Sequence, residues 1–113
     1  MISYGQVMEI FHDYLSETSC VEILKTKWGY VRLFCEMPYY DSFEAVLCRT
    51  PEELFEELLD YALAARECRL MNEMKKTKEE AAEAVRAARQ FYIGEFRRKN
   101  EKSETPKVLP GNK

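Results

Sequence analysis

The residue types that most often carry out chemistry are sparse in this chain of 113 residues. His12 is its single histidine, and a histidine without a paired nucleophile makes no base–nucleophile couple. The glycines stand isolated at positions 5, 29, 94 and 111, so there is no glycine-rich loop to cradle a phosphate. The pattern predicts a protein that is not an enzyme, with no catalytic residue and no cofactor.

The cysteines are equally scattered. Cys20, Cys35, Cys48 and Cys68 are 15, 13 and 20 residues apart, and no C-x-x-C pair occurs. Zinc sites usually take two ligands from one tight turn, whereas isolated cysteines in a reducing compartment most often fill space as free thiols. We therefore expect four free thiols and no metal site.

Carboxylates are the most regularly spaced candidates. Glu53, Glu56, Glu57 and Asp60 recur at helical intervals, and Glu67 follows on the same stretch. Such a stripe is usually a solvated helix face, and carboxylates near a helix start also complement its dipole. The stripe also supports an alternative function, because an acidic inhibitor-type protein of a phage or mobile element would use it to occupy a basic groove.

Three helices must position these residues. The pairs Ser3–Gln6, Thr50–Glu53 and Thr77–Glu80 each have the capping-box spacing, a hydroxyl residue followed three positions later by Glu or Gln. The predicted helices run over about residues 4–17, 51–72 and 78–98. The inward arc of the third helix is made of small and aromatic residues, namely Ala81, Ala84, Val85, Ala88, Phe91, Tyr92 and Phe96.

Between the first two helices the apolar period becomes two, which indicates strands at Val21–Thr26, Tyr30–Glu36 and Phe43–Arg49. A three-residue loop over 27–29 would place Gly29 in the left-handed conformation. That register pairs Ile23 with Leu33 and Val21 with Cys35 on an inner face. The predicted fold is α+β, with a helix, a three-stranded antiparallel meander and two C-terminal helices. We expect one domain over residues 1–98 and a disordered, basic polar tail over 99–113.

Residues 28–43 hold six of the fourteen aromatic residues of the chain. In the predicted register, Tyr30, Arg32 and Phe34 lie on the outer sheet face, where either the first helix covers them or they form an exposed patch. An aromatic patch with a charged rim is typical of protein-interaction hot spots. The sequence therefore predicts a small interaction or regulatory module that binds a partner protein or a second copy of itself. The expected contact residues are Trp28, Tyr30, Arg32, Phe34, Tyr39 and Tyr40.

The charge distribution suggests another alternative. Residues 1–74 carry 6 Lys/Arg and 14 Asp/Glu, whereas residues 75–113 carry 11 and 6. A nucleic-acid-associated protein would use the basic C-terminal helix and tail for phosphate contacts, while the overall charge of −3 opposes such binding. The residues for this alternative are Arg86, Arg97, Arg98 and Lys99.

Composition limits the setting. With 46% hydrophobic and 33% charged residues, the chain has the make-up of a soluble globular protein. No apolar run approaches the length of a membrane-spanning helix, and the first residues lack a secretory pattern. We expect a cytoplasmic accessory protein of a bacterium or phage with no membrane partner.

Overall fold

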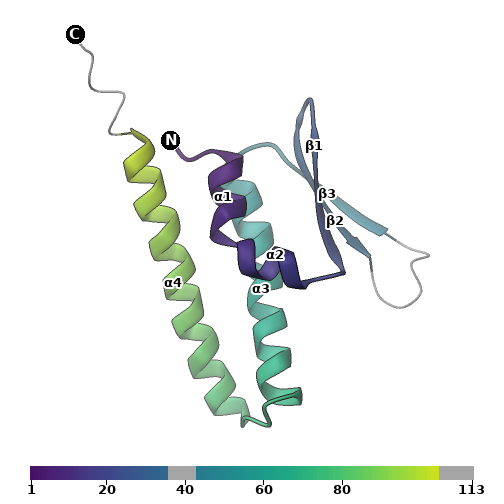
Figure 1. The fold of residues 1–113 in the computed structure, drawn as a ribbon, viewed down its shortest axis with the longest axis vertical. Coiled ribbons are helices and arrows are strands. Elements are labelled where there is room, and N and C mark those ends of the chain that lie inside the picture. The colour runs from purple at the N-terminus through teal and green to yellow at the C-terminus, as the bar shows by residue number, and fades with distance from the viewer. Residues whose placement is uncertain (36–42, 105–113) are drawn as a thin grey trace. The chain divides into compact units, whose positions relative to one another are not determined.

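A computed structural model of the chain describes residues 1–35 and 43–104. Two short helices precede a three-stranded antiparallel sheet of order β1-β2-β3, and two long helices follow it (Figure 1). The predicted α+β class and element order are confirmed. The helices are α1 (Tyr4–Ile10), α2 (His12–Glu17), α3 (Pro51–Asn72) and α4 (Lys78–Glu104), and the strands are β1 (Val21–Thr26), β2 (Gly29–Cys35) and β3 (Phe43–Cys48).

Two predicted helices differ from the structure. The first helix is interrupted at Phe11, whose backbone leaves the helical conformation (φ −101°, ψ 21°) while its side chain is fully buried and packs against Phe55. Helix α4 runs to Glu104, so residues 99–104 are helical rather than part of a tail. Residues 105–113 lie outside the described residues, and the single domain over 1–98 stays a prediction.

At all three predicted helix starts, the capping hydroxyl accepts the expected backbone hydrogen bond. Ser3 Oγ accepts the Gln6 N–H while the Gln6 side chain accepts the Ser3 N–H, and Thr77 and Glu80 make the same reciprocal pair. At α3 the Thr50 hydroxyl accepts the Glu53 N–H, but the Glu53 carboxylate accepts from Arg49 instead of Thr50. Each bond satisfies a backbone donor at a helix start that has no partner within the helix.

The register of the first hairpin differs from the prediction by one residue. Thr26 pairs with Gly29, so the turn has two central residues, Lys27 and Trp28, and Ile23 lies opposite Arg32 instead of Leu33. Gly29 is the first residue of β2, with φ of +144°. A Cβ there would lie 2.4 Å from the Cys48 carbonyl oxygen, so the close approach of β3 requires glycine at this strand position.

Because side chains alternate along a strand, this shift exchanges the partners of every residue in β1 and β2. Val21 and Ile23 share a face with Tyr30, Arg32 and Phe34, not with Leu33 and Cys35. The structure therefore contradicts the predicted separation of the inner apolar residues from the aromatic residues.

The described residues form two compact units. The first unit, Ser3–Glu57, holds the sheet, α1, α2 and the start of α3. The second holds Met1, Ile2 and residues 58–104, with the Ile2 N–H donating to Asn100 Oδ1 at 2.8 Å. The buried apolar residues of the first unit are Val7, Phe11, Val21, Cys35, Cys48, Leu54 and Phe55, and those of the second are Ile2, Leu58, Leu59, Ala62, Leu63, Ala81 and Ala88. Within the described ranges, no helix is both long enough and apolar enough to cross a membrane.

Candidate interaction surface

The sheet of the first unit has two unlike faces, set by the hairpin register. Tyr30, Arg32 and Phe34 of β2 point to one side, where α1 and the start of α3 lie. We call this side the covered face. It also carries Val21 and Ile23 of β1 and Glu44, Val46 and Cys48 of β3.

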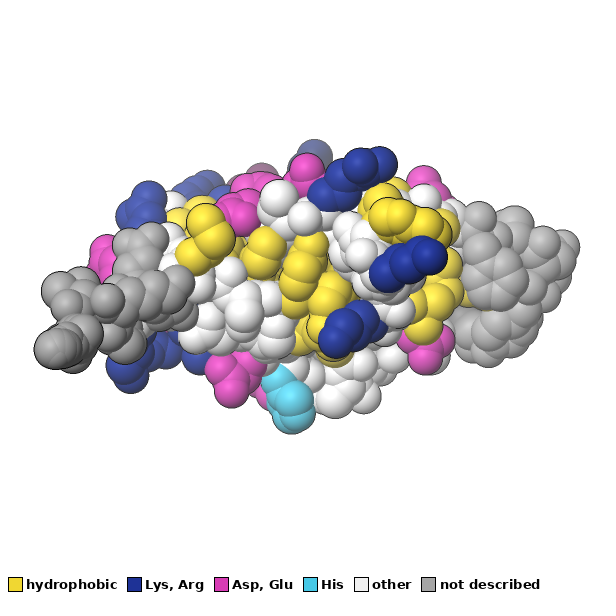
Figure 2. Space-filling view, turned by 90° about the horizontal axis from the view of Figure 1, so that it is seen from above, with side chains coloured by type: hydrophobic (Ala, Val, Ile, Leu, Met, Phe, Trp, Pro, Cys, Tyr) yellow, Lys and Arg dark blue, Asp and Glu magenta, His cyan; other side chains and the backbone are white. Residues whose placement is uncertain are grey.

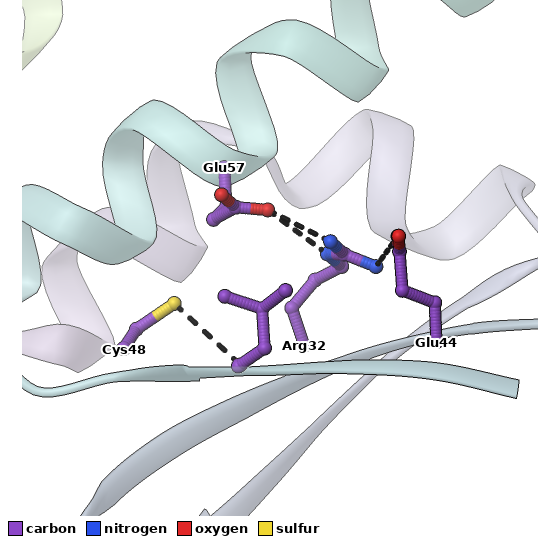
Figure 3. Close-up of polar contacts among 5 residues, drawn as sticks. Arg32, Glu44, Cys48 and Glu57 are labelled. Atoms are coloured by element: carbon purple, nitrogen blue, oxygen red, sulfur yellow. Dashed lines mark hydrogen bonds and ion pairs between the residues drawn. The ribbon is translucent and has the colours of Figure 1, made fainter.

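Arg32 is the central polar residue of the covered face. Its side chain is only 3% exposed, and its Nε and Nη2 groups donate to Glu57 Oε1 of α3 at 3.1 and 2.9 Å (Figure 3). Nη1 donates to Glu44 Oε1 of β3 at 3.1 Å. A buried guanidinium without such partners would carry a large desolvation penalty, which the two carboxylates offset, the less exposed Glu57 more than Glu44.

The aromatic residue Tyr30 is covered in a different way. Its ring stacks on that of Tyr4 from α1, with 4.3 Å between centroids, and the Tyr4 hydroxyl donates to the Cys48 carbonyl at 3.0 Å. Burial raises the pKa of Tyr4, and nearby Cys48 and Glu53 reinforce the shift. Burial also raises the pKa of the Cys48 thiol, with Glu57 and Glu53 adding to it. Both groups are therefore neutral at neutral pH, and Cys48 is poorly suited to act as a nucleophile.

The opposite side of the sheet is mostly apolar and more accessible, although the exposed Glu22 of β1 lies beside Leu33 and the buried Cys35 ends the β2 row. We call it the open face and define it by five residues that lie together through cross-strand pairing. Val31 is paired with Leu24 on one side and Leu47 on the other, and Leu33 is paired with Ala45. Leu24 is 45% exposed, Ala45 is exposed, and the other three are half-buried. The open face thus comprises Leu24, Val31, Leu33, Ala45 and Leu47.

Trp28 stands at the tip of the β1–β2 hairpin. Its side chain is 68% exposed, and Lys27 Nζ lies 5.1 Å from its ring centroid, within cation–π range. The Thr26 hydroxyl holds the turn by accepting the Trp28 N–H at 3.2 Å and donating to the Gly29 carbonyl at 2.8 Å. The backbone of the turn is therefore ordered while the indole remains accessible to solvent.

The predicted contact residues are thus divided by the structure. Trp28 is exposed, whereas Arg32 is buried and Tyr30 and Phe34 lie half-buried on the covered face. The expected exposed patch on that face is wrong for Arg32, because helices cover the face as the competing interpretation required. Tyr39 and Tyr40 lie outside the described residues. The sequence analysis did not select the open face, although Leu24, Leu33 and Leu47 are its visible signal.

The structure also gives the positions of the residues named for the two alternative functions. Arg86, Arg97, Arg98 and Lys99 all lie on α4; Arg86 pairs with Glu83, and Arg98 pairs with Glu95 at 2.6 Å. In the acidic stripe of α3, Glu57 binds Arg32 and Glu53 binds the Arg49 N–H. These stripe members therefore have roles within the fold.

The remaining candidates for chemistry do not converge. His12 lies at the surface with its side chain 78% exposed (Figure 2), and its Nδ1 is 3.7 Å from the neighbouring Asp13 carboxylate. The four cysteines carry free thiols, with Cys68 exposed on α3. In the part of the chain that the structure describes, no three His, Cys, Asp or Glu residues gather in a way that could hold a metal ion.

Comparison with known proteins adds no relative: no protein-family model, curated protein or solved structure matches this chain.

Proposed function

We propose that the protein is a non-catalytic interaction module whose open face binds an amphipathic helix of a partner protein. The observation that carries the proposal is the joined apolar surface of Leu24, Val31, Leu33, Ala45 and Leu47 on a sheet whose other face is already covered. An apolar sheet face is normally covered by a helix or a second sheet.

The dimensions of the open face favour a helix as the occupant. Three strands about 4.8 Å apart place the outer two about 10 Å from each other, which is the diameter of one helix with its side chains. Strands of six residues are about 20 Å long, the length of roughly 13 helical residues. Trp28 at the hairpin tip would contact the end of this helix, and exposed tryptophan is enriched among residues that dominate binding energy.

The test uses the purified full chain as bait in nuclease-treated lysate of the source organism. We compare the wild type with Leu24→Asp, which places a charge on the open face, and with Ala64→Asp, a matched charge at an exposed position of α3. We expect a retained protein with the wild type and the Ala64 variant, and its loss with Leu24→Asp. The retained protein's binding segment, made as a peptide, should gain helical circular dichroism on mixing with the chain.

Three outcomes contradict the proposal. Retention that survives Leu24→Asp would place binding on another surface, and a peptide that binds without becoming helical would exclude the helix. Material that disappears on nuclease treatment would favour the nucleic-acid alternative, which predicts a steep salt dependence and loss on neutralising Arg97 and Arg98.

A further inference from the structure

Beside its buried side, helix α4 carries a second stripe of residues that is largely exposed. At 100° per residue, the buried Ala81 and Ala88 lie on one side, and a separate stripe about 80° wide is centred roughly 90° away from them. Phe91 is at its middle and is 61% exposed, although the sequence pattern placed it among the inward residues. Its ring meets that of the adjacent Tyr92 edge-on at 5.8 Å. The stripe comprises Glu80, Ala84, Ala87, Phe91, Gly94 and Arg98.

Gly94 lies within this stripe, and no contact in the isolated chain explains why a glycine stands at this position. A glycine inside a helix costs about 1 kcal/mol relative to alanine. A Cβ at Gly94 would meet no atom within 4 Å, so no close packing in the chain requires glycine there. Small residues at helix positions allow another backbone to approach closely. Ala87 and Ala84, about two and three turns before Gly94, allow the same close approach.

Beside these alanines the surface is hollowed. An open hollow of about 560 Å³ is lined by apolar and charged residues of both helices and the loop between them, namely Leu70, Lys76, Glu79, Glu80, Glu83, Ala84 and Ala87. All of these residues belong to the second unit. A large apolar side chain presented from outside has room to enter this hollow, and Phe91 is such a side chain on the same stripe.

The charges along α4 indicate how a second copy would lie. Carboxylates predominate near its start, at Glu79, Glu80 and Glu83. Near its end the basic residues Arg97, Arg98, Lys99 and Lys102 outnumber the carboxylates Glu95, Glu101 and Glu104. The Thr77 backbone N–H lowers the pKa of Glu80, and the hydrogen bond from Arg98 lowers the pKa of Glu95, so both carboxylates are charged near neutral pH. An antiparallel partner places opposite charges together and opposes the helix dipoles, whereas a parallel partner places like charges together.

We propose that α4 pairs with α4 of a second copy of this chain as a two-fold antiparallel coiled coil. Taking Ala84, Phe91 and Arg98 as one seam position and Glu80, Ala87 and Gly94 as the other gives an unbroken seven-residue spacing. In antiparallel alignment Phe91 meets the second copy's Ala87, Ala84 meets its Gly94, and Glu80 meets its Arg98. Large therefore meets small, and acid meets base. An arginine has five N–H donors, so Arg98 can keep Glu95 and add the second copy's Glu80.

This inference goes beyond the proposed function, since it concerns α4 and not the sheet. A single helix pair is at the small end of stable interfaces, so we expect a dimer with a micromolar dissociation constant. Sedimentation equilibrium of the full chain, from micromolar to near-millimolar concentration, should show a monomer–dimer equilibrium.

The variant Gly94→Leu distinguishes an effect on dimerisation from an effect on the fold of the monomer. Because a Cβ at position 94 enters open space in the monomer, we expect the thermal stability of the monomer to stay equal or rise. The dissociation constant of the dimer should rise at least roughly tenfold. Arg89→Leu, at an exposed position on a different side of the same helix, is the matched control and should leave the dissociation constant unchanged.

A charge exchange tests the antiparallel direction. Glu83 flanks the seam opposite Arg97 of the second copy, whereas within one helix the two residues are 14 positions or about 21 Å apart. Glu83→Arg and Arg97→Glu should each weaken the dimer by several-fold, and the double variant should restore it. A chain that stays monomeric at all concentrations overturns the proposal. So does a dimer insensitive to Gly94→Leu, or single variants whose effects simply add in the double variant.

Discussion

The two faces of the sheet use opposite kinds of side chain for opposite purposes. The covered face carries a buried arginine between two carboxylates and a stacked pair of tyrosines, held by hydrogen bonds to α1 and α3. The open face carries only aliphatic side chains at its centre, and Leu24 and Ala45 remain exposed. The polar-looking face is therefore the inner one, and the apolar face is the accessible one.

This difference teaches that burial in a small α+β unit follows from the elements that cover a face, not from its hydrophobicity alone. Arg32 has a long apolar stem, and a helix that supplies Glu57 offers it a partner, so the guanidinium can be taken out of water. The aliphatic face has no such geometric requirement. It remains suitable for a partner that the chain itself does not provide.

The largest expected difference between the two sheet faces is in the stability loss when neighbouring residues of β2 are replaced. Phe34→Asp puts a charge on the covered face, where we expect the free energy of unfolding to fall by roughly 3 kcal/mol. Leu33→Asp puts the same charge on the open face, where the loss should be about 1 kcal/mol because water can reach the carboxylate. Urea unfolding followed by circular dichroism measures both. A larger loss for Leu33→Asp would show that the Leu33 side of the sheet is the buried one, as the sequence pattern predicted.

A smaller effect is expected at the ion pairs of the covered face. Arg32→Ala leaves Glu57 partly buried without its partner, and we expect a loss of about 2 kcal/mol, reduced from the fully buried case because both carboxylates are partly solvated. Glu44→Gln should change stability by less than about 0.5 kcal/mol, since its side chain is 63% exposed. Equal losses for the two variants would show that the pair with Glu44, and not the pair with Glu57, accounts for the contribution of Arg32.

The smallest effect is a pH dependence specific to the covered face. The pKa of Cys48 is raised in the folded chain, so the unfolded chain ionises first as the pH increases past the ordinary value of 9.0. Stability from this group is present below that pH and is lost as the pH rises through the folded pKa. We expect Cys48→Ala to flatten the fall in stability above pH 9.0, and Cys68→Ala, at an exposed thiol, to leave it unchanged. Chemical denaturation at a series of alkaline pH values measures both slopes.

Local signals predicted the elements well. Each capping signal lies at an observed helix start, and the predicted bounds of α3 match those observed, because capping and helix periodicity depend on residues within a few positions. The break at Phe11 could not be predicted in this way, since no local signal marks it and the Phe11 side chain packs against Phe55, more than 40 positions away in the chain. Likewise, nothing near Phe91 in the sequence distinguishes it from its buried neighbours on α4.

By itself, the sequence determined the α+β class, the order of helices and strands, the scarcity of catalytic residue types and the division of charge between the two ends of the chain. Only the tertiary structure decided which face of the sheet is covered. The reason is that the covering contacts, Tyr4 on Tyr30 and Glu57 on Arg32, join residues far apart in the sequence. The hairpin register likewise involves the approach of Gly29 to the Cys48 carbonyl, and a shift of one residue exchanges the face on which each residue of β1 lies relative to β2.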